Sequence, residues 1–395
     1  MRRLNFSPEQ RKILKIIGKM AKSSGYSAYL VGGAVRDLLL GRTSQDVDIV
    51  CVGDAVELAK KFSEKVEGKL IFQQDFPNAT VKCKEFGKID FVTARREKYP
   101  KDKVDLPKVE KTEEIKEDLK RRDFTINAVA ANLNPEKFGN LIDPFNGLLD
   151  CRKRLIRILH PDSFKEDPTR IFRAIRFKME LSFNLEKDTY KFLKRHLMFL
   201  TKLTPDRLWK EIRLSLRDTS VVFKYFKKYK ILDILDLNSP DDVFLGRVDK
   251  GSVQFGVDPV NTFILALTEN RDPGSFNFSR EFTQQMKYVR KIDEDRLLDI
   301  EVVHELFLLE DYSLLYLFAK SPGNSIILEN FFDNRGDLKP ELNGEEIKKL
   351  GAREGPEIGK IMNRIIEGRW IGKISSKDEE IEFVERYIGG KNVLW

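Results

Sequence analysis

The stretch VGGAVRDLLLGRTSQDVDIV, residues Val31 to Val50, decides how the chain begins to fold. An apolar strand pattern ends at Gly32 and Gly33, and a short helical pattern follows in AVRDLLLG. A second strand pattern, DVDIVCV, comes next and carries two aspartates, Asp46 and Asp48. Strand, glycine turn, helix and acidic strand in such close succession predict a mixed unit of helices and strands.

Length and composition place this unit in a larger chain. With 395 residues the chain is too long for one compact core, so we expect two or more domains. No apolar run approaches the roughly 20 residues that span a bilayer, and the N-terminal residues show helical spacing without a signal-peptide core. Three widely spaced cysteines fit neither a zinc site nor a disulfide framework. We therefore expect a cytoplasmic protein that does not bind membranes.

The net charge permits a polyanionic partner without requiring one. Lys and Arg number 71 against 63 for Asp and Glu, which gives a formal charge of +8. Such an excess attracts RNA, and a well-solvated surface explains it equally well.

Secondary-structure signals change along the chain. Up to about Asp150, strand-like segments rich in β-branched residues surround one clear amphipathic helix, DAVELAKKFSEKV. The segment from Glu97 to Lys120 has almost no apolar periodicity until its end and is predicted to be a mobile loop. Beyond about Asp162, spacing of three to four residues predicts helices throughout.

The acidic pair points to a metal. Asp46 and Asp48 lie two residues apart, so on a strand both side chains project from one face, away from the core. Two carboxylates on one face are costly unless cations neutralise them, and Mg²⁺ prefers such hard oxygen ligands. Asp90, in GKIDFVTA, would join them from a neighbouring strand, and two or three carboxylates can hold two metals for phosphoryl transfer. An exposed strand end gives the same D-x-D pattern.

The glycines before the acidic pair point to a phosphate. Gly32 and Gly33 lie between a strand and a helix, where backbone without Cβ and free N–H groups favour phosphate oxygens. Arg36, in the first turn of the helix, adds a planar cation. Gly-Gly alone indicates a turn, whereas Gly-Gly followed by this arginine and then by D-x-D is specific.

GGAVRD, LLG and DVD together resemble the signature of the nucleotidyltransferase superfamily. More narrowly, they resemble the class II tRNA nucleotidyltransferases (CCA-adding enzymes) and their bacterial poly(A) polymerase relatives. Three further motifs follow in the family's order and resemble its ribose- and phosphate-contacting motif, its hinge and its nucleobase-reading motif. They are RRDFTINA (Arg121–Ala128), DPFNGLLD (Asp143–Asp150) and EDPTRIFRAIRF (Glu166–Phe177).

The resemblance implies an α+β fold. A small nucleotidyltransferase head with a mixed, partly antiparallel sheet would precede an all-helical neck, body and tail. The implied domains are residues 1–145, 146–217, 218–330 and 331–395, with the nucleobase-reading motif in the neck and tRNA binding in the tail. LNGEEIKKLGAREGPEIGKIM near the end also resembles a tail segment of bacterial members.

The resemblance also implies roles for individual residues. Asp46 and Asp48 would bind Mg²⁺ as catalytic residues, with Asp90 assisting. Asp123, with Arg122 and Asn127, would position the ribose, although a strand-to-helix corner with an Arg–Asp surface pair also explains RRDFTINA. The implied nucleotide-binding residues are Gly32, Gly33, Arg36, Arg121, Arg122, Asp123, Asn127, Glu166, Asp167, Arg170 and Arg173.

Asp167 and Arg170 suit the reading of a base. Cytosine and adenine each present an amino donor beside a ring-nitrogen acceptor, so one carboxylate and one guanidinium pair with both. Uracil and guanine would leave buried groups unpaired, at about 1–3 kcal/mol each. Local structure offers alternatives: Asp167 as a helix cap before Pro168, or an Asp167–Arg170 ion pair. Ser163 and Glu166 also fit a capping box.

The implied function is the addition of CCA, from CTP and ATP, to the 3′ end of tRNA. Helices would recognise the acceptor and TΨC region of the tRNA by shape and charge, although their basic faces also suit solvent. Within the family, the alternatives are CC-only addition, A-only addition and poly(A) synthesis. Outside the family, the alternative is a non-catalytic RNA-binding protein. The long segment between Arg95 and Arg121 argues against CC-only addition, but it lacks an Asp-Gly-Arg-like run, which leaves A-only addition open.

Overall fold

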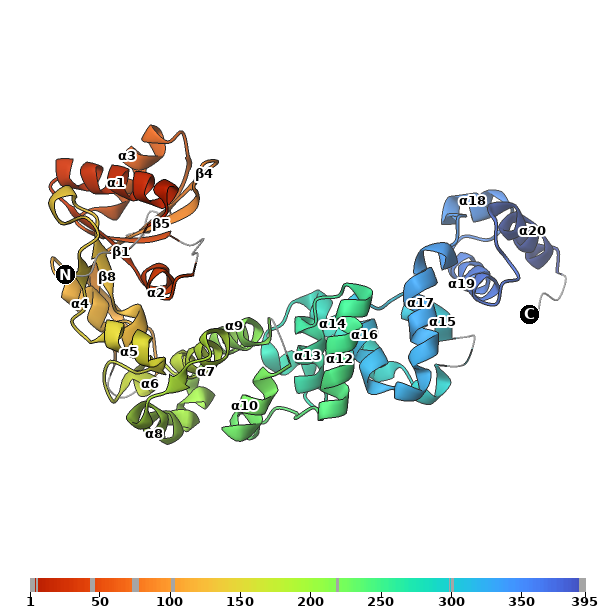
Figure 1. Cartoon of the computed structure of the whole chain (residues 1–395). Coiled ribbons are helices and arrows are strands. Elements are labelled where there is room, and N and C mark those ends of the chain that lie inside the picture. The colour runs from red at the N-terminus through yellow and green to blue at the C-terminus, as the bar shows by residue number, and fades with distance from the viewer. Residues whose placement is uncertain are drawn as a thin grey trace. The chain divides into compact units, whose positions relative to one another are not determined.

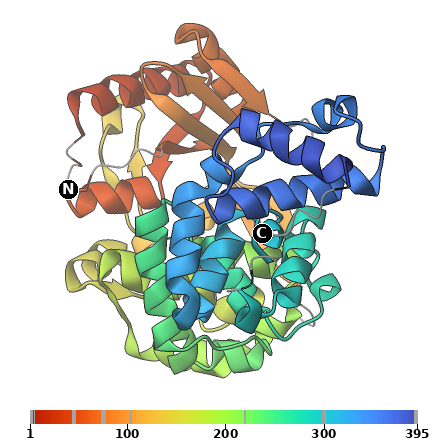
Figure 2. The ribbon, with the colours of Figure 1, turned by 90° about the vertical axis from the view of Figure 1, so that its right-hand side faces the viewer.

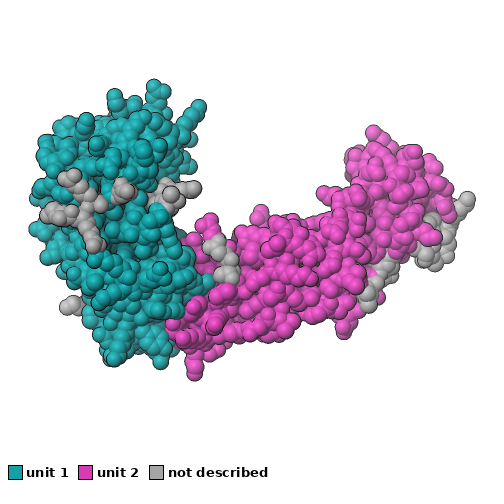
Figure 3. All heavy atoms as spheres, viewed as in Figure 1, with its two compact units in different colours: residues 1–211 teal, residues 212–395 magenta. Residues whose placement is uncertain are grey.

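The computed structural model describes residues 4, 6–42, 47–72, 78–100, 104–217, 220–297, 299 and 302–390. The chain divides into two compact units, residues 1–211 and 212–395 (Figure 3). An α+β head precedes a helical remainder, as predicted (Figure 1). Within the described ranges, no helix combines the length and the apolarity needed to cross a membrane. The division into four domains stays a prediction.

A seven-stranded sheet forms the centre of the first unit. Its strand order is β3-β4-β5-β2-β1-β8-β9. Strands β2 and β5 run parallel, whereas β1 runs antiparallel to β2 and to β8, so the predicted mixed sheet is confirmed. The strands are β1 (Ser27–Val31), β2 (Val47–Val52), β3 (Lys69–Phe72), β4 (Asn78–Cys83), β5 (Gly87–Thr93), β8 (Ala130–Asn132) and β9 (Leu141–Ile142).

Helices α1 (Pro8–Ser23) and α3 (Ala55–Lys65) pack on one face of this sheet (Figure 2). A capping box of Ser7 and Gln10 starts α1, satisfying backbone N–H groups that have no partner inside the helix. Both helices are amphipathic, and their apolar sides join the sheet in one core that includes Ile17, Leu30, Ile49, Phe62 and Phe91. The strand residues that alternate with these core residues therefore project from the opposite face of the sheet.

The described parts of the segment predicted to be a mobile loop include two paired strands and helix α4 (Ile115–Lys120), so the prediction of a loop is wrong for these parts. Strands β6 (Arg95–Lys98) and β7 (Lys108–Lys111) pair antiparallel. Glu110 on β7 forms ion pairs with Arg96 and Lys98 on β6, both at 3.1 Å. Opposite charges across the strands stabilise the hairpin, and apolar periodicity carries no signal of such pairs.

Short helices complete the first unit. Strand β10 (Leu155–Ile156) pairs in parallel with β11 (Asn184–Leu185), and β11 interrupts the region beyond Asp162 where helices throughout were expected. The helices are α2 (Gly33–Leu39), α4 (Ile115–Lys120), α5 (Gly147–Lys153), α6 (Ser163–Glu166), α7 (Thr169–Leu181), α8 (Lys187–His196) and α9 (Pro205–Leu216), with 3₁₀ turns η1 (Thr125–Asn127), η2 (Pro135–Lys137) and η3 (Leu197–Lys202).

The elements that the structure describes within the second unit are helices, as expected. The last of them share a small apolar core that includes Ile347, Ile361, Ile365 and Phe383. The α-helices are α10 (Val222–Lys228), α11 (Ile231–Ile234), α12 (Asp242–Phe255), α13 (Val260–Leu267), α14 (Arg280–Lys291), α15 (Val303–Leu306), α16 (Asp311–Lys320), α17 (Ser325–Leu338), α18 (Gly344–Lys349), α19 (Pro356–Trp370) and α20 (Lys377–Ile388).

Candidate active site

One cleft in the first unit brings most of the predicted site residues together. Its volume is about 1250 Å³. Asp90 and Glu166 are not among the described residues that line it, and Asp46 lies outside the described residues. The predicted residues that do line it are Gly32, Gly33, Arg36, Asp48, Arg121, Arg122, Asp123, Asn127, Asp167, Arg170 and Arg173.

Asp48 reaches the cleft from the face of β2 on which we expected it. The next residue, Ile49, is buried in the core on the opposite face. Asp90 is the register partner of Asp48 on the parallel strand β5, so the predicted pairing of the two acidic strands is confirmed. The Asp90 carboxylate accepts hydrogen bonds from Thr80 Oγ1 at 2.5 Å and from Lys88 Nζ at 2.6 Å. Of these two carboxylates, Asp48 lines the cleft.

The donor chemistry of this sheet face fits a hard divalent cation. Asp48 and Asp90 begin from adjacent positions on one face and offer carboxylate oxygens, the ligands that Mg²⁺ prefers. Among the described residues, no group of three or more His, Cys, Asp or Glu side chains is placed to hold an ion. Asp46, one of the two predicted metal ligands, lies outside those residues, so the metal site stays a prediction.

The glycine turn approaches Asp48 closely. Gly32 joins β1 to α2 with φ at +71°, a conformation that side chains with a Cβ rarely adopt. A Cβ at this position would lie 3.2 Å from Arg122 Nη1 and 3.6 Å from Asp48 Oδ2. Glycine is therefore needed for the turn, and a larger residue would also require the Arg122 guanidinium to shift by a few tenths of an ångström.

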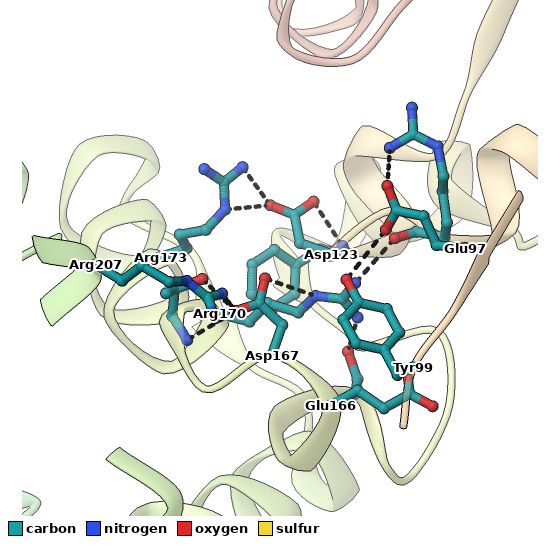
Figure 4. Close-up of polar contacts among 12 residues, drawn as sticks. Glu97, Tyr99, Asp123, Glu166, Asp167, Arg170, Arg173 and Arg207 are labelled. Carbon is teal, nitrogen blue, oxygen red and sulfur yellow. Dashed lines mark hydrogen bonds and ion pairs between the residues drawn. The ribbon is translucent and has the colours of Figure 1, made fainter. Parts of the chain in front are cut away.

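A series of hydrogen bonds connects α2 to α7. Arg36 Nη1 donates to Asn127 Oδ1 at 3.0 Å, and Asn127 Nδ2 donates to Asp123 Oδ1 at 3.0 Å. Asp123 Oδ2 accepts from Arg173 Nε at 2.8 Å and from Arg173 Nη2 at 2.6 Å (Figure 4). Asp123 is buried, so the alternative of an Arg–Asp pair on the surface is wrong. The series holds RRDFTINA between the two helices.

The ionisation of Asp123 depends on Arg173. Burial acts to raise the pKa of Asp123, but the positive charge of Arg173 and hydrogen bonds from Asn127 and Arg173 outweigh it, so the pKa lies below its ordinary value. A carboxyl group with a lowered pKa stabilises the fold above its unfolded pKa, about 3.9. That contribution is lost as the pH falls through the folded pKa.

Replacing Arg173 by Met is expected to destabilise the protein in a pH-dependent way. Without the guanidinium, burial raises the pKa of Asp123. The folded variant is therefore destabilised while Asp123 is charged, and it regains stability once Asp123 is protonated. The free energy of unfolding lost on mutation should be largest near pH 7. It should shrink as the pH falls, first through the raised pKa of Asp123 in the variant and then through its lowered pKa in the wild type. Urea denaturation of both proteins between pH 7 and pH 3 measures this difference. A difference independent of pH would contradict the electrostatic coupling.

Arg121 and Arg122 are anchored by a carboxylate that the sequence analysis missed. Asp118 on α4 is fully buried, and it accepts from Arg121 Nε at 2.9 Å and from Arg122 Nη2 at 3.0 Å. Burial acts to raise the pKa of Asp118, but the charges of Arg122 and Arg121 outweigh it, so the pKa is lowered. Glu97 on β6 also accepts from Arg121, at 3.1 Å. A signal for these contacts was present in the sequence, because Asp118 precedes Arg121 by three residues and Arg122 by four, which are spacings typical of ion pairs on a helix.

Asp167 and Arg170 lie where α6 meets α7. Asp167 Oδ1 accepts from the backbone N–H and the hydroxyl of Thr169, at 3.1 and 2.6 Å. The N-cap residue of α7 is Pro168, so the alternative of Asp167 as the N-cap with proline in the first turn is wrong. Arg170 Nε is 3.9 Å from Asp167 Oδ2, which confirms the alternative of an ion pair. The capping box is wrong, because the Ser163 hydroxyl instead accepts from Arg170 Nη1 at 2.6 Å. Arg170 Nη2 donates to the Arg121 carbonyl oxygen at 2.9 Å.

Arg207 was also missed as a residue of the cleft. It lies on α9 and donates from Nη2 to Asp167 Oδ1 at 2.8 Å (Figure 4). No spacing in the sequence relates Arg207 to Asp167, because the two residues are forty positions apart and meet through tertiary packing.

Phe177 lies against Arg36 and Arg173 of the cleft and against the neighbouring Arg176. Its ring centroid lies 5.0 Å from the guanidinium of Arg36, 5.5 Å from that of Arg173 and 5.8 Å from that of Arg176. Guanidinium groups are attracted to the face of an aromatic ring at such distances. The sequence signal was the four-residue spacing from Arg173, which places both side chains on one side of α7.

Glu166 lies in a neighbouring pocket of about 440 Å³ and not in the cleft. Its Oε2 is 3.3 Å from His160 Nε2. Burial raises the pKa of Glu166 and lowers that of His160. The predicted contact of Glu166 with a nucleotide stays a prediction.

The chain resembles known proteins in sequence and fold. Residues 28–157 match a family model described as the poly A polymerase head domain. A solved tRNA nucleotidyltransferase, complexed with a primer tRNA and an incoming ATP analog, is 32% identical, with a TM-score of 0.65 over 82% of this chain and 99% of that chain. The chain belongs to the family of tRNA nucleotidyltransferases and poly(A) polymerases.

Other members of the tRNA nucleotidyltransferase family align with almost the whole chain. A CCA-adding enzyme in its apo form II has a TM-score of 0.82 and 27% identity, covering 97% of this chain and 99% of that chain. An A-adding tRNA nucleotidyltransferase from Aquifex aeolicus (strain VF5) is 43% identical over 92% of this chain. The chain spans 45% of that relative's length and 46% of the length of the A-adding enzyme of Geobacter sulfurreducens.

Proposed function

We propose that this protein is a tRNA nucleotidyltransferase, which transfers nucleotides from nucleoside triphosphates to the 3′ end of tRNA and releases pyrophosphate. The observation that carries the proposal is the single cleft that Asp48 of the sheet shares with Asp167 and Arg170 of the α7 region. A carboxylate for metal-assisted phosphoryl transfer and a pair of side chains for a base are the two parts that such an enzyme needs. The names of the family's A-adding and CCA-adding members support the proposal.

The carboxylates would hold the metal. Asp46 and Asp48 are the proposed ligands of Mg²⁺, and Asp90 would assist from β5. When bound, Mg²⁺ neutralises triphosphate oxygens and makes the attacking hydroxyl of the RNA more acidic. Asp48 would orient these groups from the sheet face beside the glycine turn, since its Oδ2 lies 3.6 Å from the position of a Cβ on Gly32.

The glycine turn and the arginines would hold the triphosphate. Gly32 and Gly33 allow phosphate oxygens to approach the backbone without a side chain in the way. Arg36, Arg121 and Arg122 would supply fixed positive charge, as planar guanidinium groups suit phosphate oxygens. The buried carboxylate of Asp118 holds Arg121 and Arg122 in place. Asp37 and Asn127 accept hydrogen bonds from Arg36.

Asp123 and Asn127 would contact the ribose. Carboxylate and amide oxygens accept hydrogen bonds from ribose hydroxyl groups, which favours ribonucleotides over deoxyribonucleotides. The bonds of Asp123 to Arg173 and of Asn127 to Arg36 orient both groups before a nucleotide arrives. Such preorganisation lowers the cost of binding.

Asp167 and Arg170 would read the base. The carboxylate accepts from the amino group of cytosine or adenine, and the guanidinium donates to the adjacent ring nitrogen. Uracil and guanine would set a carbonyl against the carboxylate and an N–H against the guanidinium, which leaves buried polar groups unpaired. Arg207 bonds to Asp167 Oδ1 and would help to orient it.

The tRNA partner would be recognised by the helices. Duplex RNA presents its backbone and 2′-hydroxyl groups more readily than its base edges, so shape and charge would determine binding of the acceptor and TΨC region. The net charge of +8 is compatible with this mode of binding.

Two activities within the family are candidates: complete CCA addition and addition of the final A alone. Two observations favour addition of the final A alone. The Aquifex and Geobacter relatives are named A-adding enzymes, and the segment around the β6–β7 hairpin lacks the Asp-Gly-Arg-like run. The Asp167–Arg170 pair, which would accept C and A alike, supports complete CCA addition. These two activities differ in the RNA end that each one extends.

Incubation with tRNAs of defined 3′ ends tests the function. The substrates end before the first C, after the first C or after the second C, and each is supplied with labelled CTP or ATP. A CCA-adding enzyme labels all three with the matching nucleotide, whereas an A-adding enzyme labels the last one with AMP. Released pyrophosphate is measured in parallel. If no tRNA is extended and no pyrophosphate appears, the proposed function is wrong and a non-catalytic RNA-binding role takes its place.

A further inference from the structure

The cleft and the pocket that contains Glu166 share a wall. Both cavities are lined by the same set of residues along their boundary: Glu97, Tyr99, Arg121 and Arg170. Hydrogen bonds to Asp118 and Glu97 explain the position of Arg121. Tyr99 has no role in the site described so far.

Tyr99 lies against Arg170. Its ring centroid is 5.9 Å from the Arg170 guanidinium carbon, within the range of a cation–π contact. Its hydroxyl donates to Glu97 Oε2 at 3.1 Å, which connects the ring to strand β6 (Figure 4). The hairpin thus presents an aromatic face to the arginine proposed to read the base.

Arg170 makes hydrogen bonds mostly to neutral groups. Its Nη1 and Nη2 donate to the Ser163 hydroxyl and to the Arg121 carbonyl oxygen, and the Asp167 carboxylate is 3.9 Å away. Arg170 also lines the second pocket, and so does Glu166. A charged carboxylate is a stronger acceptor for a guanidinium than a neutral oxygen. Glu166 is therefore a competitor for Arg170.

Glu166 has a weak partner of its own. It lies 3.3 Å from His160, and burial lowers the pKa of that imidazole, so the pair has little ionic character at neutral pH. Its side chain is about one-third exposed, at 31%, toward the pocket that it shares with Arg170. If the Arg170 guanidinium turned from the cleft into this pocket, it would gain the charged carboxylate of Glu166 as an acceptor. It would then no longer donate to the base in the cleft.

We propose that Tyr99 is a positioning residue, whose ring keeps the Arg170 guanidinium directed to the cleft and away from Glu166. This inference rests on the proposed function, because Arg170 must read a base for its orientation to affect selectivity. The hairpin then contributes to the choice of nucleotide without touching the base. A merely structural role of Tyr99 would change stability or overall rate without changing the preference among nucleotides.

The test compares Tyr99→Leu, Tyr99→Phe and the double variant Tyr99→Leu with Glu166→Gln. For each, kcat/KM is measured with all four nucleoside triphosphates on one primer tRNA that the wild type extends. We expect Tyr99→Leu to lower the preference for the correct nucleotide over UTP and GTP by about 10- to 100-fold. Tyr99→Phe retains the ring and should retain the preference. Removing the charge of Glu166 in the Leu background should restore most of it.

Two outcomes would overturn the inference. One is a Tyr99→Leu variant with the wild-type preference, and the other is a double variant that selects no better than Tyr99→Leu. Thermal melting and tRNA affinity are measured for every variant, and Tyr99→Met is included so that one poorly folded protein does not decide the result. If the wild type itself extends no tRNA, the proposed function fails; if it does and the variants match it, this inference alone fails.

Discussion

Nucleotide incorporation is expected to fall by about a thousandfold or more when Asp48 is replaced by Ala or Asn, with tRNA binding retained. Asp48 lines the cleft from β2, and its carboxylate would hold the cation that neutralises the triphosphate. Asn keeps the size of the side chain and removes its charge, so the two variants together separate charge from packing. Single-turnover incorporation of labelled nucleotide and filter binding of tRNA give the two measurements.

An exposed aspartate in the same unit provides the control for Asp48. Asp188 on α8 is about two-thirds exposed, at 64%, so Asp188→Ala changes the net charge equally and should leave incorporation unchanged. Substantial incorporation by both Asp48 variants, with correctly folded protein, would remove Asp48 from the metal site. Loss of tRNA binding in step with incorporation would point to misfolding or to a role in the RNA complex.

Replacing Asp118 by Ala is expected to lower the free energy of unfolding by about 3–5 kcal/mol. The substitution leaves the guanidinium groups of Arg121 and Arg122 without the buried carboxylate that neutralises them. Breaking a buried ion pair from one side is costly because the remaining charge is still desolvated. Urea denaturation measures the loss, and the KM for the nucleotide should rise as well because both arginines line the cleft.

Glu113→Ala is the matched control for Asp118. Glu113 is exposed and precedes the same helix, so its removal changes the net charge equally without uncovering a buried cation. A loss below about 1 kcal/mol for Asp118→Ala, similar to that for an exposed pair, would show that the two arginines do not depend on it.

Much of the candidate site could be predicted because its residues are local in sequence. Gly32, Gly33 and Arg36 belong to one strand-turn-helix, and Asp48 follows on the next strand, where period two defines its face. These relations need only backbone geometry, which is the same in every protein. Their placement in one cleft with the α7 region agreed with the resemblance to the family.

Other features depended on partners distant in the sequence. The β6–β7 hairpin is stabilised by charge pairs such as Arg96–Glu110, which an analysis of apolar spacing does not detect. The link between Arg207 and Asp167 joins positions on separate helices. Whether a charged residue is neutralised, exposed or able to bind a ligand depends on the residues around it. Those residues come from distant parts of the sequence.

The sequence by itself determined the α+β architecture, the glycine turn and the acidic strand, because helix and strand periods and backbone sterics act between near neighbours. Tertiary structure alone decided that Asp118 anchors two arginines, that Asp123 pairs with Arg173 and that the Tyr99 ring lies against Arg170. The physical reason is that electrostatic and aromatic contacts act through space. Their strength depends on burial and on distances of a few ångströms, which packing sets after the local elements have formed.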